Sequence, residues 1–256
     1  MSTSPRVVLV TGCTKGGIGY SLSQEFARTG CIVYATARKL EVMDGLDESN
    51  IHKLVLDVTN EKQIAEVVST IVEAEGRIDV LVNNAGMSCP GPLLDLTLEQ
   101  ARRIFETNTF AVLTLSRAVV PHMARRHKGV VVNVSSVMGE VPTPWMGMYA
   151  ATKAALHSIT ETLWMECKAL NVDVMLLVPG QVTSNIAVNG IAAFDMPENS
   201  LYRRYFKNIL ERVAYSQSAG AIPADEFSRA VVSASLSTSP PRTWVLGMFW
   251  RRWTKA

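Results

Sequence analysis

The chain has little cysteine, no strong charge imbalance and no long apolar run. Its four cysteines, at positions 13, 31, 89 and 167 of 256 residues, are widely scattered and include no Cys-x-x-Cys pair. Neither a metal site nor a disulfide framework is therefore expected, and a reducing, intracellular compartment fits best. The 25 basic and 23 acidic residues leave a net charge of +2, with no basic block that would attract nucleic acid.

The sequence also shows no segment with the pattern of a targeting signal or of a membrane-spanning helix. Met1–Val10 passes from a short polar lead into an apolar strand, without the charged, apolar and cleavage regions of a signal peptide. No apolar run is long enough to span a bilayer. With 48% hydrophobic and 19% charged residues the chain can bury one sizeable core. We therefore expect a single domain over residues 1–256, located in the cytoplasm.

Short β-branched runs alternate with longer segments of helical period. The runs lie at residues 6–10, 31–36, 52–56, 78–82, 129–134, 172–178 and 243–246. Helical spacing of apolar residues occurs over 18–28, 61–75, 98–126 and 148–170. This alternation predicts an α/β fold, a Rossmann-like doubly wound domain with a mostly parallel seven-stranded sheet and helices on both faces. Because ligands bind at the carboxyl ends of such strands, functional residues are expected just after them.

The segment 184–223 is the least periodic part of the chain. It contains one amphipathic stretch around 201–213 and no obvious strand. We interpret it as a substrate-covering segment, with an ordinary pair of surface helices as the alternative.

A glycine-rich turn, Thr11-Gly-Cys-Thr-Lys-Gly-Gly-Ile-Gly19, follows the first predicted strand and leads directly into a helix. Glycines let the backbone turn tightly and approach a pyrophosphate, while the helix amino terminus offers free N–H groups to its charge. Many strand-to-helix turns are rich in glycine for steric reasons alone. The position after the first strand nevertheless favours a dinucleotide site.

The second predicted strand ends in Arg38 and Lys39, where an NAD site would carry an acidic residue to bind the ribose 2'-hydroxyl. Arg38, helped by Lys15 and Lys39, can instead pair with a 2'-phosphate, because a guanidinium binds phosphate bidentately. The expected cofactor is therefore NADP(H). The alternative is that the two basic residues simply form a solvated strand end.

Tyr149 and Lys153 open a predicted helix, and their four-residue spacing places the phenol and the ammonium on one face. A fixed positive charge favours the phenolate and is expected to lower the tyrosine pKa. Such a phenol can donate a proton to a carbonyl oxygen or take it back. Ser135 and Ser136 follow the fifth predicted strand, where a hydroxyl can bond the reacting oxygen. The Tyr-to-Lys spacing alone is common in amphipathic helices.

Together these motifs resemble the short-chain dehydrogenase/reductase family in order and spacing. The resemblance spans about residues 6–185 and rests on the turn at 11–19, Asp57-Val58, Asn83-Asn84-Ala85-Gly86, Asn108, Ser136, Tyr149 to Lys153, and Pro179-Gly180 with Thr183. It implies that Tyr149 is the general acid/base and that Ser136, thirteen residues before it, positions the substrate oxygen. Lys153 would lower the Tyr149 pKa and bind the nicotinamide ribose, and Asn108 would hold a water in the proton relay.

The same resemblance implies a set of cofactor-binding residues along the groove. They are Gly12, Thr14, Lys15, Gly17, Ile18, Gly19, Arg38, Asp57, Val58, Asn83, Ala85, Gly86, Asn108, Tyr149, Lys153, Pro179, Gly180, Val182 and Thr183. The glycine turn is one residue longer than the family's commonest form, so either Gly16 or Gly17 is the middle glycine; counting back from Ile18-Gly19 favours Gly17. The non-enzymatic alternative is an NADP(H)-binding sensor or scaffold.

The stretches 33–38 and 83–86, followed by Pro90-Gly91-Pro92, resemble the branch of the family containing 17-beta-hydroxysteroid dehydrogenases and fungal 1-acyldihydroxyacetone-phosphate reductases. This implies a hydrophobic ketone or alcohol substrate, first an acylated ketone phosphate in lipid metabolism. The alternative is a terpenoid, polyketide or other secondary-metabolite ketone, or a steroid.

Two groups of side chains bear on this substrate. Apolar side chains near the expected active-site loops suit such a molecule, namely Met87, Met138, Trp145, Met146 and Met148, although core packing accounts for them equally. Arg203, Arg204 and Lys207 are candidates to meet a substrate phosphate, with a solvated helix face as the alternative.

The carboxyl-terminal tail, residues 244–256, mixes indoles with cations. Segments that rest in a bilayer interface have this composition, so peripheral contact with endoplasmic reticulum or lipid droplets is one interpretation. The other is that Trp244 to Leu246 form the last edge strand and the remainder packs at a homo-oligomer interface.

Overall fold

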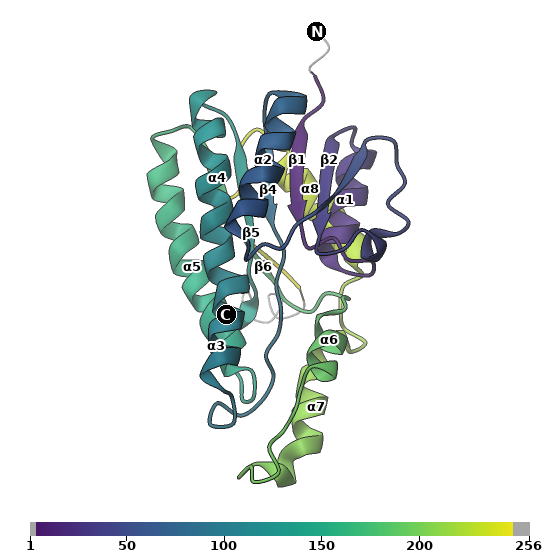
Figure 1. Ribbon diagram of the computed structural model, residues 1–256, viewed down its shortest axis with the longest axis vertical. Coiled ribbons are helices and arrows are strands. Elements are labelled where there is room, and N and C mark those ends of the chain that lie inside the picture. Colours follow the sequence, from purple (N-terminus) through teal and green to yellow (C-terminus); the bar gives the residue numbers. More distant parts are fainter. Residues whose placement is uncertain (1–3, 248–256) are drawn as a thin grey trace, which may run out of the picture.

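The computed structural model describes residues 4–247, which form one parallel sheet with helices on both faces (Figure 1). The strands are β1 (Val7–Thr11), β2 (Ile32–Ala37), β3 (Ile51–Val55), β4 (Val80–Asn83), β5 (Val130–Val134), β6 (Asp173–Pro179) and β7 (Thr243–Leu246). Their order is β3-β2-β1-β4-β5-β6-β7 and every neighbouring pair is parallel. The predicted fold class is confirmed, and the order reverses between β1 and β4, where such sheets open a ligand crevice.

The central strands are apolar on both faces because helices cover both. Every residue of β1, β4 and β5 is buried, as their near-continuous valine runs predict. The register places Val8 of β1 beside Val33 of β2 and Val80 of β4. The sheet therefore holds the turns after β1, β4 and β5 side by side at its carboxyl edge.

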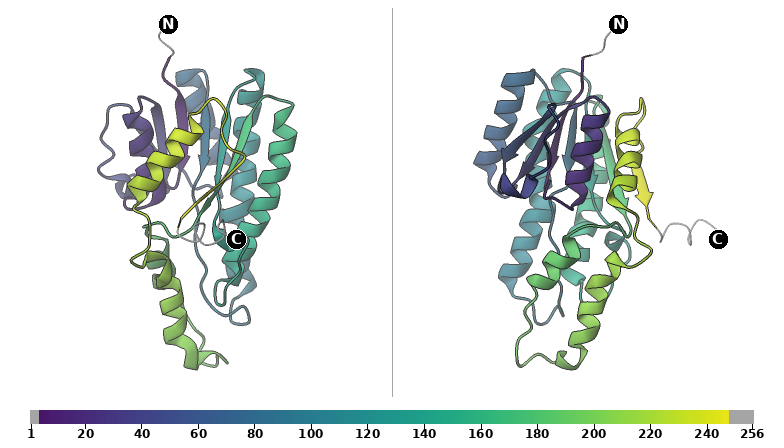
Figure 2. Two further views of the ribbon diagram at one scale, coloured as in Figure 1. Left: turned by 180° about the vertical axis from the view of Figure 1, so that it is seen from behind. Right: turned by 90° about the vertical axis from the view of Figure 1, so that its right-hand side faces the viewer.

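Two helical layers complete the core (Figure 2). One face is covered by α1 (Ile18–Arg28) and α8 (Ala224–Ser235), whose Phe26 and Phe227 are both buried against the sheet. The other face is covered by α2 (Glu61–Glu75), α4 (Ala111–Arg125) and α5 (Gly147–Lys168). The bounds of α1 and α2 are those predicted from the sequence.

The helix predicted over 98–126 is interrupted. It consists of α3 (Leu98–Phe105), a π-helical turn η2 (Glu106–Phe110) and α4. A capping box formed by Thr97 and Gln100 starts α3. Such π turns often occur at functional sites, and this one contains Asn108.

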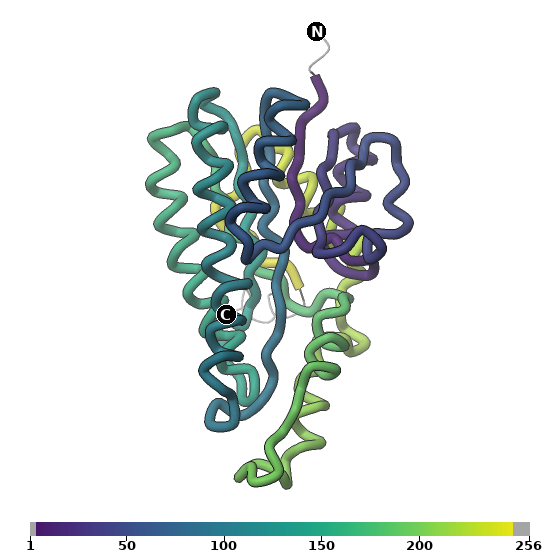
Figure 3. Tube along the Cα trace, viewed as in Figure 1, coloured from purple at the N-terminus to yellow at the C-terminus, as the bar shows by residue number. Residues whose placement is uncertain are grey.

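An arm leaves the sheet after β6 and projects beyond the carboxyl ends of the strands (Figures 1 and 3). It contains α6 (Ile186–Ala192), the short turns η4 (Arg203–Tyr205) and η5 (Tyr215–Gln217), and α7 (Phe206–Ala214). A parallel bridge between Val182 and Ile222 closes its base. The Thr183 N–H donates to the Ile222 carbonyl at 3.0 Å, so both ends of the arm are fixed where they leave the domain.

The end of the chain is only partly described. Trp244 to Leu246 lie in β7, as one of the two interpretations requires. Residues 248–256 lie outside the described residues, so membrane contact and an oligomer interface both remain predictions for them. Over residues 4–247, no helix is both long and apolar enough to cross a bilayer.

Asp79 ties the start of β1 to α4. Its carboxylate accepts from the Val7 N–H at 2.9 Å and pairs with Arg77 at 3.0 Å and Arg126 at 2.7 Å. Burial would raise the pKa of Asp79, but these partners together lower it. The ion pairs therefore stabilise the fold above the pKa of the unfolded chain, and that contribution is lost as the pH falls through the lower folded pKa.

Asp79→Asn should lower the free energy of unfolding by about 2–3 kcal/mol, the lower range for breaking buried charged bonds, since both arginines are partly exposed. Urea unfolding at neutral pH measures this free energy. The difference in unfolding free energy between the variant and the unsubstituted protein should shrink in acid. Asp47→Asn is the matched control, because Asp47 pairs with Lys53 at 3.2 Å but is 75% exposed. Equal losses of unfolding free energy in the two variants would contradict the stabilising role of the Asp79 ion pairs.

Candidate active site

A cleft of about 1140 Å³ lies at the carboxyl edge of the sheet. The turns after β1 to β6 line it on the sheet side, and the arm residues of α6, α7 and η5 form its opposite wall. The cleft contains Ser136, Tyr149 and Lys153. It therefore lies where the strand order predicts a ligand crevice.

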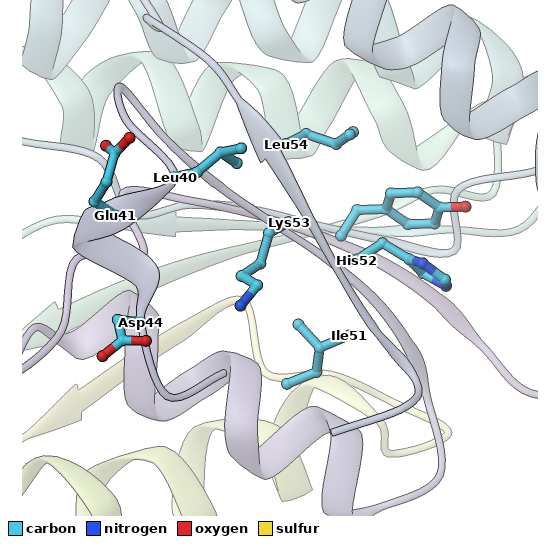
Figure 4. Close-up of a pocket in the computed structure, with 8 residues that line it drawn as sticks. Leu40, Glu41, Asp44, Ile51, His52, Lys53 and Leu54 are labelled. Carbon is cyan, nitrogen blue, oxygen red and sulfur yellow. The ribbon is translucent and has the colours of Figure 1, made fainter. Parts of the chain in front are cut away.

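A second hollow, of about 700 Å³, lies on the outer edge strand β3 (Figure 4). Figure 4 shows Ile51, Lys53 and Leu54 of β3 on one side and Leu40 and Asp44 on the other. None of the residues predicted for catalysis or cofactor binding lines it. The candidate active site is therefore the cleft.

The phosphate loop after β1 forms one end of the cleft through Gly12, Thr14, Gly17 and Ile18. Gly12 has a φ of 74°, and a Cβ there would lie 2.7 Å from the Ala85 Cα. The backbone of the next turn thus passes directly against Gly12, which only glycine permits.

The positions of Gly16 and Gly17 relative to the cleft indicate which of them is the middle glycine of the phosphate loop. Gly17 lines the cleft and is the N-cap of α1, whereas Gly16, with a φ of 78°, lies against the Asn185 side chain. This favours Gly17 as the middle glycine. Lys15 and Gly19 do not line the cleft. The Lys15 ammonium is 3.8 Å from an Asp44 carboxylate oxygen and largely exposed, and its contact with a phosphate stays a prediction.

Gly12→Ala should weaken dinucleotide binding by about tenfold or more and destabilise the fold, because the methyl group forces β1 and the Ala85 turn apart. Gly30→Ala is the matched control. Gly30 has a φ of 83°, but an added Cβ would meet nothing within 4 Å, so it carries the backbone strain without the clash. Fluorescence titration with NADPH compares the two. Equal affinities would contradict a close approach at Gly12.

Beside the carboxyl ends of β2 and β3, the cleft combines one basic and one acidic group. Arg38, exposed after β2, and Asp57 and Val58, after β3, all line it. Burial would raise the pKa of Asp57, but bonds from Thr59 and the nearby charges of Arg38 and Arg103 lower it. Arg103, from α3, was not anticipated from the sequence. This part of the cleft therefore offers two guanidinium groups for an anion.

The turn after β4 is held by Thr11, whose hydroxyl accepts the N–H groups of Asn84 and Ala85 at 3.0 Å each. Asn84, Ala85 and Gly86 line the cleft, but Asn83 does not. The Asn83 amide is buried in the sheet and donates to Asn133 at 2.8 Å. The expectation that Asn83 lines the groove was wrong by one residue, because alternate strand residues face opposite sides.

Asn108 connects three elements at the π turn. Its Oδ1 accepts the Met87 N–H at 2.9 Å, and its Nδ2 donates to the Met87 carbonyl at 2.9 Å and to Thr152 Oγ1 at 3.1 Å. The side chain is fully buried and does not line the cleft. Direct cofactor contact through this side chain is therefore corrected to a positioning role between the β4 turn and α5. The water-holding role remains a prediction.

Ser136, Tyr149 and Lys153 meet at the centre of the cleft. Ser136 lies two residues after the end of β5 and interacts with the Tyr149 phenol so as to lower its pKa, which supports its choice over Ser135. The Lys153 Nζ donates to the Val134 carbonyl at 2.9 Å and lies 5.7 Å from the Tyr149 ring centroid. Helix α5 thus places the phenol and the ammonium on one face, as their spacing predicts.

Burial dominates the electrostatics of this group. It raises the pKa of Tyr149 to about 12, opposed only by the Ser136 bond, and lowers the pKa of Lys153 to about 8. The expectation that Lys153 lowers the tyrosine pKa is therefore not met by the protein's own groups. Desolvation dominates, and the phenol is protonated at neutral pH. It is prepared to donate a proton rather than to accept one.

The remaining predicted contacts lie at the carboxyl end of β6 and directly after it. Pro179, Gly180 and Val182 line the cleft, whereas Thr183 does not. The Thr183 hydroxyl accepts the Ala224 N–H at 3.0 Å, so this residue anchors the arm to α8. Gln181, which sequence reasoning did not single out, lines the cleft and donates to the Tyr215 carbonyl at 2.9 Å.

The substrate end is mostly apolar. Met87, Met138 and Met146 line it, with further apolar residues from the arm, but Trp145 and Met148 do not. The three basic residues proposed from the sequence, Arg203, Arg204 and Lys207, are exposed and lie outside the cleft lining. Of the two interpretations given for these residues, the structure therefore agrees with the solvated helix face. The basic residue that the arm contributes to the lining is Arg212, which the sequence gave no signal for.

Comparison with known proteins agrees with this geometry. The family described as short chain dehydrogenase matches residues 6–192. An NADPH-dependent 1-acyldihydroxyacetone phosphate reductase of Schizosaccharomyces pombe is 37% identical, over 80% of this chain and 71% of the relative. A short-chain dehydrogenase of Penicillium crustosum is 36% identical, over 91% and 85%. The crystal structure of a short-chain dehydrogenase from Streptomyces avermitilis superimposes with a TM-score of 0.85 at 30% identity, over 98% and 91%.

Proposed function

This chain belongs to the short-chain dehydrogenase family, and from that premise we propose that it is an NADP(H)-dependent reductase of a hydrophobic ketone. The observation that carries the proposal is that Tyr149, Ser136 and Lys153, all buried, together line an apolar cleft. Family membership makes the protein an oxidoreductase. The preference for NADP(H) over NAD(H) and the identity of the substrate are what we propose beyond it.

The cleft has the features that a dinucleotide phosphate requires. Gly12 allows close backbone approach, and the first turn of α1, which begins at Ile18, directs backbone N–H groups toward a pyrophosphate. Arg38 occupies the end of β2, where an NAD site would carry an acid. The S. pombe relative is named as NADPH-dependent, which agrees with this charge pattern.

The residues then divide the chemistry between them. The residues at Gly12, Arg38 and the start of α1 would hold NADPH, which would supply hydride to the carbonyl carbon. Ser136 and Tyr149 both bond the carbonyl oxygen, and Tyr149 transfers its phenolic proton to that oxygen as negative charge develops there. Lys153, held by the Val134 carbonyl, places its ammonium beside the phenol and stabilises the phenolate that remains.

We propose an acylated ketone phosphate as the substrate, as in 1-acyldihydroxyacetone phosphate reductases. The apolar lining by Met87, Met138 and Met146 suits an acyl chain. The arm forms the substrate-covering wall, because α6 and α7 supply the lining opposite Tyr149.

The test is NADPH oxidation by the purified protein with 1-acyldihydroxyacetone phosphate, a steroid ketone and a terpenoid ketone. Fastest turnover of the acyl ketone phosphate is expected. Turnover confined to another ketone would retain the reductase and reject the lipid substrate. Cofactor binding without turnover of any ketone would favour a sensor or scaffold.

A further inference from the structure

Arg212 is a cation of the arm that faces inward. It lies on α7, lines the cleft, and its Nη2 donates to the Thr143 Oγ1 at 2.7 Å. The same nitrogen lies 3.8 Å from the Met138 sulfur. Arg212 therefore reaches from the arm to the loop that follows the catalytic serine.

Within residues 4–247 the charge of this arginine is not paired with an acid, and its guanidinium carbon lies 5.9 Å from the centroid of the Tyr215 ring. Among residues 4–247 no carboxylate lies within 4.0 Å of it, whereas Lys207 on the same helix pairs with Glu211 at 3.9 Å. Partial burial lowers the pKa of Arg212, yet a guanidinium stays charged at neutral pH. Removing a cation partly from water without an acid beside it is unfavourable, and an anionic ligand would offset that cost.

Its position is at the substrate end of the cleft. The Met138 N–H donates to the Ser136 Oγ at 3.2 Å, so Met138 connects the guanidinium contact to the serine. Arg38 and Arg103, in contrast, lie near Asp57 at the opposite end. Glu140 also lines the cleft, but its side chain is 61% exposed and lies 4.0 Å from His157 Nδ1. Arg212 thus supplies positive charge beside the apolar lining, apart from the cofactor end.

We infer that Arg212 binds the anionic head group, a phosphate monoester, of an otherwise apolar substrate. This assignment deepens the proposed function and rests on it. A guanidinium already bonded to Thr143 through one nitrogen keeps its other N–H groups for a planar, bidentate contact with phosphate oxygens. The acyl chain then lies along Met87, Met138 and Met146, and the ketone lies between them at Ser136 and Tyr149.

The experiment is calorimetric titration of the NADP⁺-saturated protein with octyl phosphate, for the unsubstituted protein and Arg212→Leu. The leucine variant should bind about 10- to 100-fold more weakly, the range for loss of a charge-assisted bond. Arg203→Leu is the matched control, an exposed arginine on the same arm, and should change the affinity by less than about threefold. Thr143→Val keeps the charge of Arg212 but removes the hydroxyl that accepts its hydrogen bond. This variant should retain most of the affinity for octyl phosphate.

Two assays separate failure of this inference from failure of the proposed function. Equal octyl phosphate affinity in the unsubstituted protein and Arg212→Leu, or no binding to the former, overturns the Arg212 assignment even if 1-acyldihydroxyacetone phosphate is reduced. Loss of affinity confined to Arg212→Leu supports the assignment even if that ketone is not the substrate. In steady-state assays Arg212→Leu should lose kcat/KM for the phosphorylated ketone but not for its dephosphorylated counterpart. Equal losses on both would mean that Arg212 only holds the arm.

Discussion

Tyr149→Phe is expected to lower kcat for ketone reduction by about 10²- to 10⁴-fold, the usual contribution of a positioned general acid. The phenylalanine ring fills the same space but has no proton to give, so the carbonyl oxygen must collect its proton from water. Ser136 and Lys153 still line the cleft, and NADPH affinity should therefore change by no more than about threefold. Steady-state kinetics and a separate NADPH titration measure the two effects.

Tyr34→Phe is the matched control for this substitution. Burial and Glu75 raise the pKa of Tyr34 to about 12, the same value as Tyr149, but Tyr34 lies outside the cleft and donates to Glu75 at 3.0 Å. Its loss should leave kcat unchanged. A similar fall in both variants would indicate general damage rather than loss of an acid.

The pH dependence follows from the two pKa shifts. The phenol of Tyr149 is the active acid, and its pKa of about 12 keeps it protonated across the neutral range. Lys153 loses its charge as the pH rises through about 8, so reduction should decline on the alkaline side before the phenol itself ionises. A rate that rises with pH would contradict the assignment of Tyr149 as the proton donor.

Arg38→Asp should reverse the cofactor preference. The substitution removes a charge-assisted contact with the 2'-phosphate, places like charge beside it, and supplies an acceptor for the 2'-hydroxyl of NADH. The ratio of kcat/KM for NADPH to that for NADH is therefore expected to fall by about 10³-fold, a combination of the lost contact and the new one. Both coenzymes are measured with the same ketone.

Lys39→Asp makes the same charge change one residue later. Lys39 is exposed and does not line the cleft, so its substitution should change the ratio by less than about threefold. A large effect at Lys39, or none at Arg38, would place the 2'-phosphate elsewhere.

The strands, the first two helices and the meeting of Ser136, Tyr149 and Lys153 in one cleft could be predicted because each depends on local pattern. Valine runs mark the buried strands, and the turns after them bring Gly12, Ser136 and Ala85 to one edge whatever the loops do. The spacing of Tyr149 and Lys153 is a property of one helix. These features need only the chain direction and the order of elements.

Other features depended on contacts between distant residues. Helix α8 was not predicted because buried serines, Ser228 and Ser235, interrupt its apolar period. The π turn at Asn108 does not change the apolar spacing, so 98–126 was predicted as one helix. Arg212 was missed because its role is created by the arm folding back onto Thr143, a contact that spans 69 residues. Burial, which decides the Tyr149 pKa, also follows from packing rather than from spacing.

Transfer of deuterium from NADPH deuterated at C4 of its reduced ring to the product of 1-acyldihydroxyacetone phosphate, followed by mass spectrometry, tests the central claim most directly. The unsubstituted protein should yield an alcohol that carries a single deuterium on its carbinol carbon, and Tyr149→Phe should yield almost none in the same time. NADPH binding with no deuterated alcohol from this or any other ketone would contradict the account and leave a cofactor-binding protein without hydride transfer.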